Sequence, residues 1–545
     1  MVPKTLGTGS DRDRFGNGNL SRSRTGTNKF ASIFSSAFLL ALSYPKFNLS
    51  GTAWFALVPA LIVARKSGSY AKSFLIFLSI GFLFYLISVE WLRHVTYFGW
   101  LFVAALFAVY FGIFGAACKF FLKEGRENSA LWGLPAIWAL IEFIRTEIPV
   151  WGFGWNLLGY SQSGVLPIAR LASWLGVYGV SFLIVFINMI LWYSWTFGRQ
   201  KSNRWKVFRK LTYAVLILLI VVFHFGRVQP KPNPENQFQI SVSVIQGNIP
   251  QSQKWNPEVK SSIIEQYEKL SEFAASARPD LIVWPEAAWP GVLNLDPERE
   301  KILNFIAGVK IPLLIGSPYE GSSLTPTLSP GGRGEGEGLT KIYNSAHWID
   351  REGRVTSRYD KIRLVPFGEF VPLAHVFSLF GLEKYAYSLG VGDFSAGSDY
   401  TVFEMSKDSK PVRFSSLICF EDTFPELARQ FVKRGARFLA VITNDAWFGK
   451  SAAPYQHLQA SIFRAIEEGI PVIRAANTGV SAFILSSGEV IGRVKDQRGH
   501  DTWIAGGLTM PVSIETGTTF YCQAGFLFPL ACLLIAIFSF AIAKI

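Results

Sequence analysis

Three side chains in the second half of the sequence have the types that acyl transfer requires. Cys419 closes the strand-like stretch 414–418 and is followed at once by Phe-Glu-Asp. Glu286 ends the segment Leu-Ile-Val-Trp-Pro-Glu, and Lys361 follows Tyr-Asp between the other two. A thiol near its ordinary pKa of about 8.5 needs a base or a positive neighbour to attack an ester near neutral pH. Glu286 is a base that can take that proton.

Each of these residues also has an ordinary structural interpretation. A lone cysteine is often a small buried hydrophobe. Glu286, which follows a proline, can cap a helix, and Lys361, which follows Asp360, can form a surface ion pair. The pattern of the domain that carries all three favours the catalytic interpretation.

The pattern from residue 237 to 510 predicts how these side chains are positioned, because strand-like and helix-like segments alternate there. Predicted strands are 238–246, 280–284, 311–316, 344–349, 355–359, 414–419, 438–443, 472–475 and 482–485. Predicted helices are 259–277, 300–307, 425–434 and 453–469. The layout indicates an α/β domain in which helices cover the sheets. Glu286, Cys419 and Asn444 each follow a predicted strand, where reacting groups commonly gather.

The composition indicates a membrane protein, because 50% of the residues are hydrophobic, only 17% are charged and the mean hydropathy is +0.27. A membrane helix needs roughly 20 mainly apolar residues. Eight candidate spans lie near 29–44, 51–64, 73–91, 98–118, 129–146, 170–195, 210–226 and 524–543. The second is short.

The placement of Lys and Arg predicts the orientation of these spans, because cytoplasmic loops carry an excess of both. Basic residues concentrate in the amino-terminal tail and in the segments 65–72, 119–126 and 199–210. Both termini are therefore predicted to be cytoplasmic, and seven crossings place residues 228–523 outside. The predicted organisation is a disordered cytoplasmic tail (1–27), seven transmembrane helices (28–227), the α/β domain (237–510) and a last transmembrane helix (524–545).

The remaining features exclude several classes. The net charge of +14 is explained largely by basic loops beside apolar helices, so no nucleic-acid partner is expected. Residues 321–340 are rich in Gly, Ser and Pro, and predict a disordered insertion. The other cysteines, Cys118, Cys522 and Cys532, fall in or beside apolar segments, and no CxxC pair or metal-ligand spacing exists. We expect no disulfide inside the α/β domain, no metal and no organic cofactor.

Residues 237–510 resemble the carbon-nitrogen hydrolase, or nitrilase, superfamily through Trp-Pro-Glu286, Tyr-Asp-Lys361 and Ile-Cys419-Phe-Glu. With the membrane spans, the whole chain resembles the apolipoprotein N-acyltransferase family. Further stretches that support the resemblance are Trp-Asn-Leu-Leu-Gly-Tyr-Ser-Gln (155–162), Val-Ile-Gln-Gly-Asn-Ile-Pro-Gln (244–251) with Lys-Trp255, and Leu-Val-Pro-Phe-Gly-Glu369 (364–369). The resemblance implies a multi-pass membrane domain of about eight helices joined to an extracytoplasmic αββα sandwich.

The resemblance also implies a reaction. An acyl chain from a phospholipid such as phosphatidylethanolamine would form a thioester on Cys419, with Glu286 as base and Lys361 as oxyanion donor. The acceptor would be the α-amino group of the diacylglyceryl cysteine that begins an apolipoprotein. The implied location is the bacterial inner membrane, with the catalytic domain in the periplasm. The implied enzyme is a monomer. Each CH₂ group of an acyl chain that is buried in a bilayer stabilises membrane binding by about 0.8 kcal/mol, so extracting the substrates would be costly. Such an enzyme must therefore meet its substrates at the membrane.

Further site residues are expected with less support. By resemblance, Glu369 and Glu421 are accessory carboxylates that position Lys361 or the amine, unless they are solvated or bind backbone donors. Phe420 stands where relatives often have Tyr. Trp255, Phe420, Asn444 and Trp447 are candidate substrate-binding residues, although aromatic residues are more often core. Trp151, Trp155 and Tyr160 are candidate anchors at the membrane interface, and His94, His347 and His457 are interpreted as isolated structural histidines.

Three alternatives stay open. A membrane-tethered nitrilase-type amidase would use the same three residues on a small exported substrate, but one span would suffice for it. A transporter or scaffold would need intramembrane polar residues, and few are visible beyond Glu90, Glu142 and Asn188. A metal-dependent glycosyl or phospholipid transferase lacks a matching ligand set.

Overall fold

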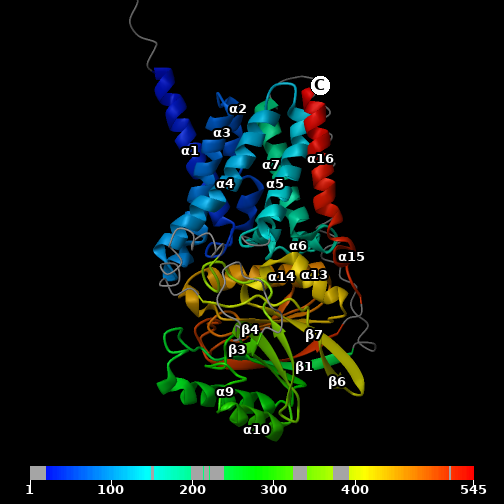
Figure 1. The fold of residues 1–545 in the computed structure, drawn as a ribbon. Coiled ribbons are helices and arrows are strands. Elements are labelled where there is room, and N and C mark those ends of the chain that lie inside the picture. Colours follow the sequence, from blue (N-terminus) through cyan, green and yellow to red (C-terminus); the bar gives the residue numbers. More distant parts are fainter. Residues whose placement is uncertain are drawn as a thin grey trace, which may run out of the picture.

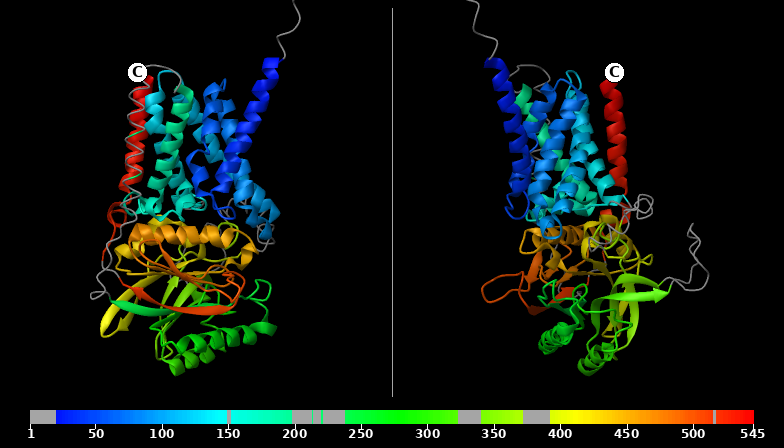
Figure 2. Two further views of the ribbon diagram at one scale, coloured as in Figure 1. Left: turned by 180° about the vertical axis from the view of Figure 1, so that it is seen from behind. Right: turned by 60° about the vertical axis from the view of Figure 1, so that its left-hand side comes forward.

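The computed structural model describes residues 20–148, 152–197, 213, 220, 238–322, 340–371, 392–514 and 517–545. Figure 1 shows a bundle of long helices standing on a compact α/β domain, and Figure 2 shows the same two-part arrangement from two other sides. The carboxyl terminus lies at the end of the bundle far from the α/β domain, as does the beginning of the first helix (Figure 1).

Apolar sequence forms the bundle. Its main helices are α1 (Leu20–Leu42), α2 (Val58–Lys66), α3 (Tyr70–Ser88), α4 (Tyr97–Phe121), α5 (Glu127–Glu147), α7 (Ala172–Phe197) and α16 (Leu527–Lys544). Within the described chain, α3, α4, α7 and α16 are long and apolar enough to cross a membrane, and the apolar part of α1 is shorter. The count of eight spans stays a prediction.

Two of the predicted spans need comment. Candidate 51–64 does not form one long helix, because the 3-10 helix η1 (Ser50–Trp54) precedes a nine-residue α2. At 1.5 Å per residue, α2 reaches only about 14 Å, and Pro59 near its start prevents the two helices from merging. Candidate 210–226 lies outside the described residues except for positions 213 and 220.

The predicted disordered tail 1–27 is too long, because α1 already begins at Leu20. Once an apolar helix has nucleated, each added residue forms a hydrogen bond without a new nucleation cost, so a polar flank can continue it. The rest of the predicted tail, 1–19, lies outside the described residues.

The α/β domain contains two six-stranded sheets. The first has the order β12-β1-β2-β3-β4-β5 and the second has the order β11-β10-β9-β8-β7-β6. The strands of the first sheet are β1 (Gln239–Gln246), β2 (Leu281–Val283), β3 (Leu313–Ser322), β4 (Thr340–Ile349), β5 (Val355–Asp360) and β12 (Gly506–Ser513). Those of the second are β6 (Phe403–Lys407), β7 (Lys410–Ile418), β8 (Leu439–Thr443), β9 (Val472–Ala476), β10 (Ala482–Ile484) and β11 (Val490–Arg493).

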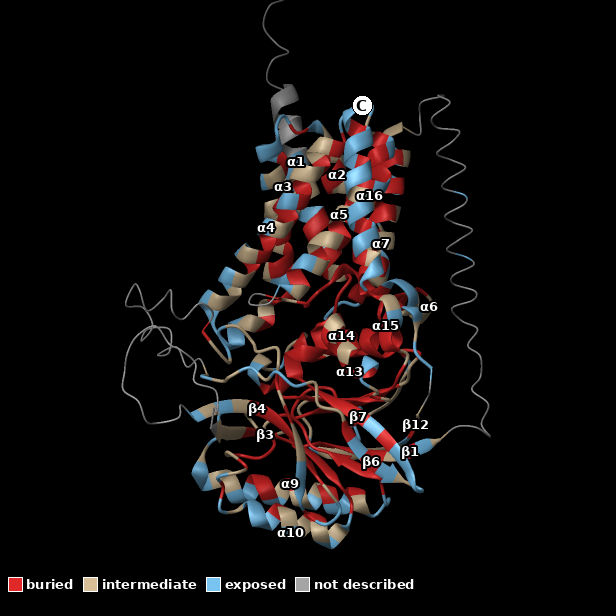
Figure 3. Ribbon diagram, turned by 45° about the vertical axis from the view of Figure 1, so that its right-hand side comes forward, coloured by how far each residue is buried: buried red, intermediate tan, exposed pale blue. Residues whose placement is uncertain are grey.

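The two sheets pack against each other between two helical layers, which gives the predicted αββα sandwich. Helices α9 (Lys260–Ala275) and α10 (Arg299–Val309) cover the outer face of the first sheet. Helices α13 (Pro425–Lys433) and α14 (Ala453–Glu468) cover the second and lie between it and the bundle (Figure 1). Figure 3 shows the buried strands between α9 and α10, which carry exposed residues, and α14, which is buried on nearly all sides.

Strand pairing corrects two predicted boundaries. Gly321 and Ser322 end β3 and pair with β4, which begins at Thr340, so the ends of the predicted insertion 321–340 are ordered strand. Antiparallel hydrogen bonds extend the hairpin into a sequence whose composition alone predicts none. Residues 323–339 lie outside the described chain. Strand β12 pairs with β1 as far as Ser513, so the domain continues past the predicted limit at 510.

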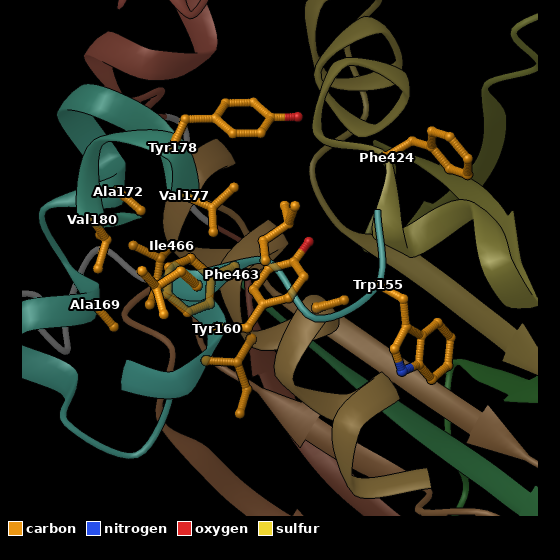
Figure 4. Close-up of a cluster of buried hydrophobic side chains, with 14 of the residues drawn as sticks. Trp155, Tyr160, Ala169, Ala172, Val177, Tyr178, Val180, Phe424, Phe463 and Ile466 are labelled. Atoms are coloured by element: carbon orange, nitrogen blue, oxygen red, sulfur yellow. The ribbon is translucent and has the colours of Figure 1, made fainter. Parts of the chain in front are cut away.

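The two domains meet through a buried contact. Trp155 and Tyr160 are 3% and 2% exposed, which contradicts their predicted role as anchors at the membrane surface. Figure 4 shows both side chains in an apolar cluster with Phe463 and Ile466 of α14. Their aromatic character therefore serves packing between the domains. Trp151 lies outside the described residues.

One polar side chain completes this contact. Gln456 of α14 accepts hydrogen bonds from the indole N–H groups of Trp91 (2.9 Å) and Trp155 (2.8 Å). Its amide nitrogen donates to the carbonyl oxygens of Pro45 (2.9 Å) and Ser88 (2.8 Å). Each of these four partners belongs to the membrane-side chain, so Gln456 fixes α14 to the bundle.

Candidate active site

The three predicted reactive side chains come from segments that follow strands. Glu286 lies three residues after β2, Lys361 follows β5, and Cys419 follows β7 and begins the short helix η6 (Cys419–Thr423). Cys419 has φ of +54°, a left-handed conformation that non-glycine residues rarely adopt. Such strained conformations persist where the surrounding structure enforces them, commonly at reactive positions.

The carboxylate of Glu286 is held at both oxygens. Oε1 accepts a hydrogen bond of 2.7 Å from the Asn344 side-chain amide, and Oε2 accepts one of 2.9 Å from the main-chain N–H of Asn444. The side chain is buried, and Lys361 Nζ lies 3.7 Å from Oε1. Glu286 is thus oriented as a hydrogen-bond acceptor beside a cation.

The ammonium of Lys361 is buried and paired with two carboxylates. Nζ lies 2.9 Å from Glu369 and 3.7 Å from Glu286. Burial by itself would lower the pKa of Lys361, but Glu369 and Glu286 outweigh burial and raise the pKa above its ordinary value. Lys361 is therefore charged near neutral pH, as an oxyanion donor must be.

Cys419 is a buried free thiol. Burial and the nearby charge of Glu286 raise its pKa well above the ordinary value, and Lys361 only partly opposes this rise. The resting side chain is therefore the neutral thiol. Because the thiolate is the nucleophile, Glu286 must take the proton as the thiol attacks.

Two supporting residues were not predicted as site residues. The side-chain amide of Asn344 on β4 donates to Glu286 Oε1 and to Glu369 Oε1, each over 2.7 Å. Lys254 donates a hydrogen bond of 3.0 Å to the main-chain oxygen of Glu286, and burial lowers its pKa to about 7. The only sequence signals were Asn344 within a buried strand and Lys254 within a family-like stretch.

The two accessory carboxylates occupy different places. Glu369 contacts Lys361 directly and also accepts from the Val365 N–H over 2.8 Å. Glu421 instead binds backbone donors, as the alternative interpretation predicted, namely the N–H groups of Ile362 (2.8 Å) and Ile418 (2.8 Å) beside the lysine and the cysteine. Burial raises the pKa of Glu421 to about 7. Glu421 thus joins the two segments that carry Lys361 and Cys419.

Of the four candidate substrate-binding residues, two are buried and two are about half exposed. Asn444 is buried, and its side chain donates to Gln251 over 2.8 Å, so its contribution to the site is the main-chain bond to Glu286. Phe420 is buried against Phe424. Trp255 and Trp447 are about half exposed, at 48% and 50%, and are free to contact a substrate.

The interpretation of His457 as an isolated histidine is wrong. Its Nδ1 lies 3.0 Å from Asp445, and its Nε2 lies 3.1 Å from the carbonyl oxygen of Cys419. His457 occurs on α14 and its partners come from two other elements, so spacing along the sequence could not reveal the contact. His347, in contrast, has a single ring hydrogen bond, to the Ser317 carbonyl at 3.3 Å.

The segments that carry the site touch the membrane-side chain. Phe367, in the loop after Lys361, contacts Phe102 of α4, with ring centroids 6.3 Å apart. Phe420 contacts Phe153, with centroids 6.0 Å apart. Phe448, at the end of the 3-10 helix that follows β8, packs on Trp91, with centroids 4.5 Å apart. The site therefore lies against the end of the helix bundle.

Among the described residues, no group of three or more His, Cys, Asp and Glu side chains has the arrangement of a metal site. The expectations of no metal and no organic cofactor stay predictions.

Comparison with known proteins gives two family matches. Residues 36–190 match the model of the apolipoprotein N-acyltransferase N-terminal domain, and residues 241–506 match that of carbon-nitrogen hydrolase. An apolipoprotein N-acyltransferase of Geobacter metallireducens is 35% identical over 91% of this chain and 92% of the relative. One of Chlorobaculum tepidum is 31% identical over 92% of this chain and 94% of the relative.

Solved structures of an amidase from Nesterenkonia sp. AN1 also match about half of the chain. One of them is 18% identical, covers 52% of this chain and 93% of its own, and has a TM-score of 0.35. The curated relatives described above carry the acyltransferase name and not that of an amidase.

Proposed function

The chain belongs to the apolipoprotein N-acyltransferase family, and on that premise we propose that its acyl transfer runs through a thioester on Cys419. Glu286 is the general base and Lys361 stabilises the oxyanion. The observation that carries this assignment is the Lys361 ammonium, held 2.9 Å from Glu369 and 3.7 Å from Glu286, whose charge also acts on Cys419.

In the first half-reaction, the Cys419 sulfur attacks the ester carbonyl of a phospholipid while Glu286 takes the thiol proton. The negative oxygen of the tetrahedral intermediate is stabilised by Lys361, and preorganised donors of this kind are worth about 2.7–4 kcal/mol. The C–O bond then breaks, and Glu286 returns the proton to the departing oxygen. The products are a lysophospholipid and the Cys419 thioester.

In the second half-reaction, the α-amino group of the diacylglyceryl cysteine of an apolipoprotein attacks the thioester. Glu286 removes a proton from the amine, and Lys361 again stabilises the oxyanion. The C–S bond breaks, and the proton on Glu286 passes to the sulfur. The products are an amide and the free thiol, so one set of residues serves both steps.

We propose phosphatidylethanolamine-like lipid as the donor and a monomer as the working enzyme. The monomer is supported by the site itself, because Glu286, Lys361, Cys419 and their partners come from one chain. Contact between the site segments and the helix bundle supports entry of lipid substrates from the membrane, since Phe367 and Phe420 both touch the membrane-side chain.

We place the α/β domain on the periplasmic face of the inner membrane and both termini in the cytoplasm. The contacts of the basic loops support this orientation. Arg65 lies 3.7 Å from Glu127 at the start of α5, and Lys123 lies over the ring of Tyr70 at the start of α3. These contacts gather the basic loops at one end, whereas Gln456 marks the other end, beside the α/β domain. Cytoplasmic loops carry the basic excess.

The proposal is tested by incubating the purified protein with phosphatidylethanolamine that carries a labelled acyl chain, without an acceptor. We expect intact mass to show one acyl group on the wild type, removable by hydroxylamine, and none on Cys419→Ala. Bound lipid without a covalent adduct would overturn the thioester mechanism. A diacylglyceryl peptide is then added to the adduct, and release of free fatty acid without transfer to the peptide would favour a hydrolase over an acyltransferase.

A further inference from the structure

A cluster of buried charges lies directly behind Cys419 and has no part in the steps above. It consists of His457 on α14, Asp422 in η6, Asp445 after β8 and Arg474 on β9, all fully buried. Arg474 lies 2.9 Å from Asp422 and 3.2 Å from Asp445. Burying isolated charges is costly, so such a cluster persists only when its charges are paired.

The surroundings of His457 fix its protonation. Nδ1 lies 3.0 Å from Asp445 Oδ1, and Nε2 lies 3.1 Å from the carbonyl oxygen of Cys419. Both partners accept hydrogen bonds, so both ring nitrogens must carry hydrogen, and the ring is an imidazolium. Two cations, His457 and Arg474, then balance the two aspartates.

The charge of His457 is stable near neutral pH. Burial and Arg474 oppose protonation, but Asp422 and Asp445 outweigh them and raise the pKa of His457 to about 9. Asp445 is held ionised, with its pKa at about 2, because His457 and Arg474 outweigh its burial.

The Nε2 hydrogen of His457 is directed at the nucleophile's own peptide group. Asp422 Oδ1 also lies 2.9 Å from Nε2 and forms an ion pair with the ring. Nε2 makes its hydrogen bond to the main chain at Cys419 O. This carbonyl belongs to the peptide that joins Cys419 to Phe420.

The other end of the same peptide is the N–H of Phe420. The described chain contains no cis peptide bond, and in a trans peptide the N–H points opposite to the C=O. The Phe420 N–H therefore points away from His457. It lies in the first turn of η6, where N–H groups have no acceptor within the helix.

We propose that His457 is a positioning residue for acyl transfer, whose imidazolium holds the Cys419–Phe420 peptide so that the Phe420 N–H joins Lys361 as a second oxyanion donor. The inference rests on the proposed thioester at Cys419. A cation bound to the carbonyl polarises the peptide and strengthens its N–H as a donor. It also keeps the peptide from turning when the oxyanion forms, and such preorganisation is how donors of this kind act.

The charge cluster is also tied to the membrane-side chain. The indole ring of Trp155 packs on the His457 ring, with centroids 5.0 Å apart. Trp155 in turn donates to Gln456, the neighbour of His457 in sequence. The groups that face His457 are therefore Asp422, Asp445, Arg474 and this uncharged ring.

The test compares His457→Leu and His457→Gln with the wild type. His457→Leu removes both the charge and the hydrogen bond, whereas His457→Gln keeps a side-chain N–H without the charge. His347→Gln is the matched control, because His347 is also buried and hydrogen-bonded to a carbonyl, that of Ser317 in the other sheet. Thermal unfolding in detergent establishes which variants fold.

Two readouts separate positioning from a structural role. The rate of thioester formation is measured in a single turnover with phosphatidylethanolamine whose acyl carbonyl carries ¹³C, over a range of lipid concentrations. The infrared stretch of the ¹³C carbonyl in the trapped thioester reports the strength of the hydrogen bonds to the reacting oxygen.

We expect His457→Leu to slow thioester formation about 10- to 100-fold at saturating lipid, with an unchanged half-saturating lipid concentration. The carbonyl stretch should move to higher wavenumber, His457→Gln should fall between, and His347→Gln should match the wild type. Wild-type rates and stretch in both folded His457 variants would overturn the inference, as would slower variants with an unchanged stretch. If His457→Leu does not fold, His457→Gln decides. Absence of a thioester on the wild type would overturn the proposed function and, with it, this inference.

Discussion

The main-chain N–H of Asn444 donates a hydrogen bond of 2.9 Å to Oε2 of Glu286, across 158 positions of sequence. Asn444 follows β8 of the second sheet, and Glu286 follows β2 of the first. One hydrogen bond therefore joins the two sheets at the base itself. Because Asn344 binds the other carboxylate oxygen, Glu286 is oriented by groups that do not react.

Replacing Asn344 with Ala should slow formation of the Cys419 thioester by about 10- to 100-fold, because small misplacements of a catalytic group can cost about that much. The change removes the side-chain amide that donates a hydrogen bond of 2.7 Å to Oε1 of Glu286 and another of 2.7 Å to Oε1 of Glu369. Single-turnover acylation with labelled phospholipid measures the effect.

The control for this variant is Asn294→Ala. The side chain of Asn294 also makes two hydrogen bonds, both to the backbone of Glu320, and it touches none of the reactive groups in those contacts. We expect wild-type acylation there. Equal rates in the two variants would show that Asn344 does not orient the base.

Lys361→Met should reduce the acylation rate by about 10²–10³-fold, the usual cost of losing one oxyanion donor. Glu369→Gln should act through the same ammonium. It removes the carboxylate that contributes most to raising the pKa of Lys361, so activity should decline at a lower alkaline pH than in the wild type. The pH–rate profiles of the acylation step in the wild type and in Glu369→Gln measure this difference. Identical profiles would contradict the role of Glu369 in keeping Lys361 charged.

Gln456→Leu should weaken the contact between the domains. The substitution leaves the indole N–H groups of Trp91 and Trp155 and two buried carbonyl oxygens without partners. Each unsatisfied buried group costs about 1–3 kcal/mol, so the melting temperature in detergent should fall by several degrees.

Gln459→Leu provides the comparison, because Gln459 is also buried on α14 but makes one hydrogen bond, to Ser163 at 3.0 Å. Its effect should be clearly smaller. Comparable melting temperatures for the two variants would mean that Gln456 does not anchor α14 to the bundle.

The stability of the protein should depend on pH through His457. Its folded pKa is raised to about 9, above an unfolded value of about 6.5. Its contribution is therefore complete below about pH 6.5 and is lost as pH rises through about 9. Melting temperatures are measured from about pH 6 to about pH 9.5, which brackets both pKa values. With rising pH, they should fall less steeply for His457→Gln than for the wild type.

Trp447→Ala should change substrate binding more than chemistry. Trp447 is half exposed at 50% in the short 3-10 helix η7 (Asp445–Phe448), so truncation should cost little stability. We expect a higher KM for the phospholipid or the acceptor with little change in kcat, as for the loss of a contact made equally in the ground and transition states. A fall in kcat at constant KM, measured with saturating second substrate, would assign Trp447 to the reaction instead.

The sequence by itself determined the classes of the reactive groups and the fold that carries them. The acid, amine and thiol follow strands that the apolar pattern marks, and β2, β5 and β7 form where strands were predicted. Strand patterns and apolar runs are local signals, because they arise from residues two to four positions apart. Such signals predicted the α/β domain and the long apolar helices, and the family resemblance added the αββα arrangement.

Only the tertiary structure decided which groups orient the reactive ones. Asn344, His457 and Gln456 are single polar residues on a strand and a helix, and nothing near them in sequence marks their partners. Trp155 and Tyr160 are of the residue types that commonly anchor proteins at the membrane surface, but they pack between the domains. Hydrogen bonds across 158 or 365 positions depend on how the sheets and helices pack. A contact of that kind is fixed by packing geometry and leaves no periodic trace in the chain.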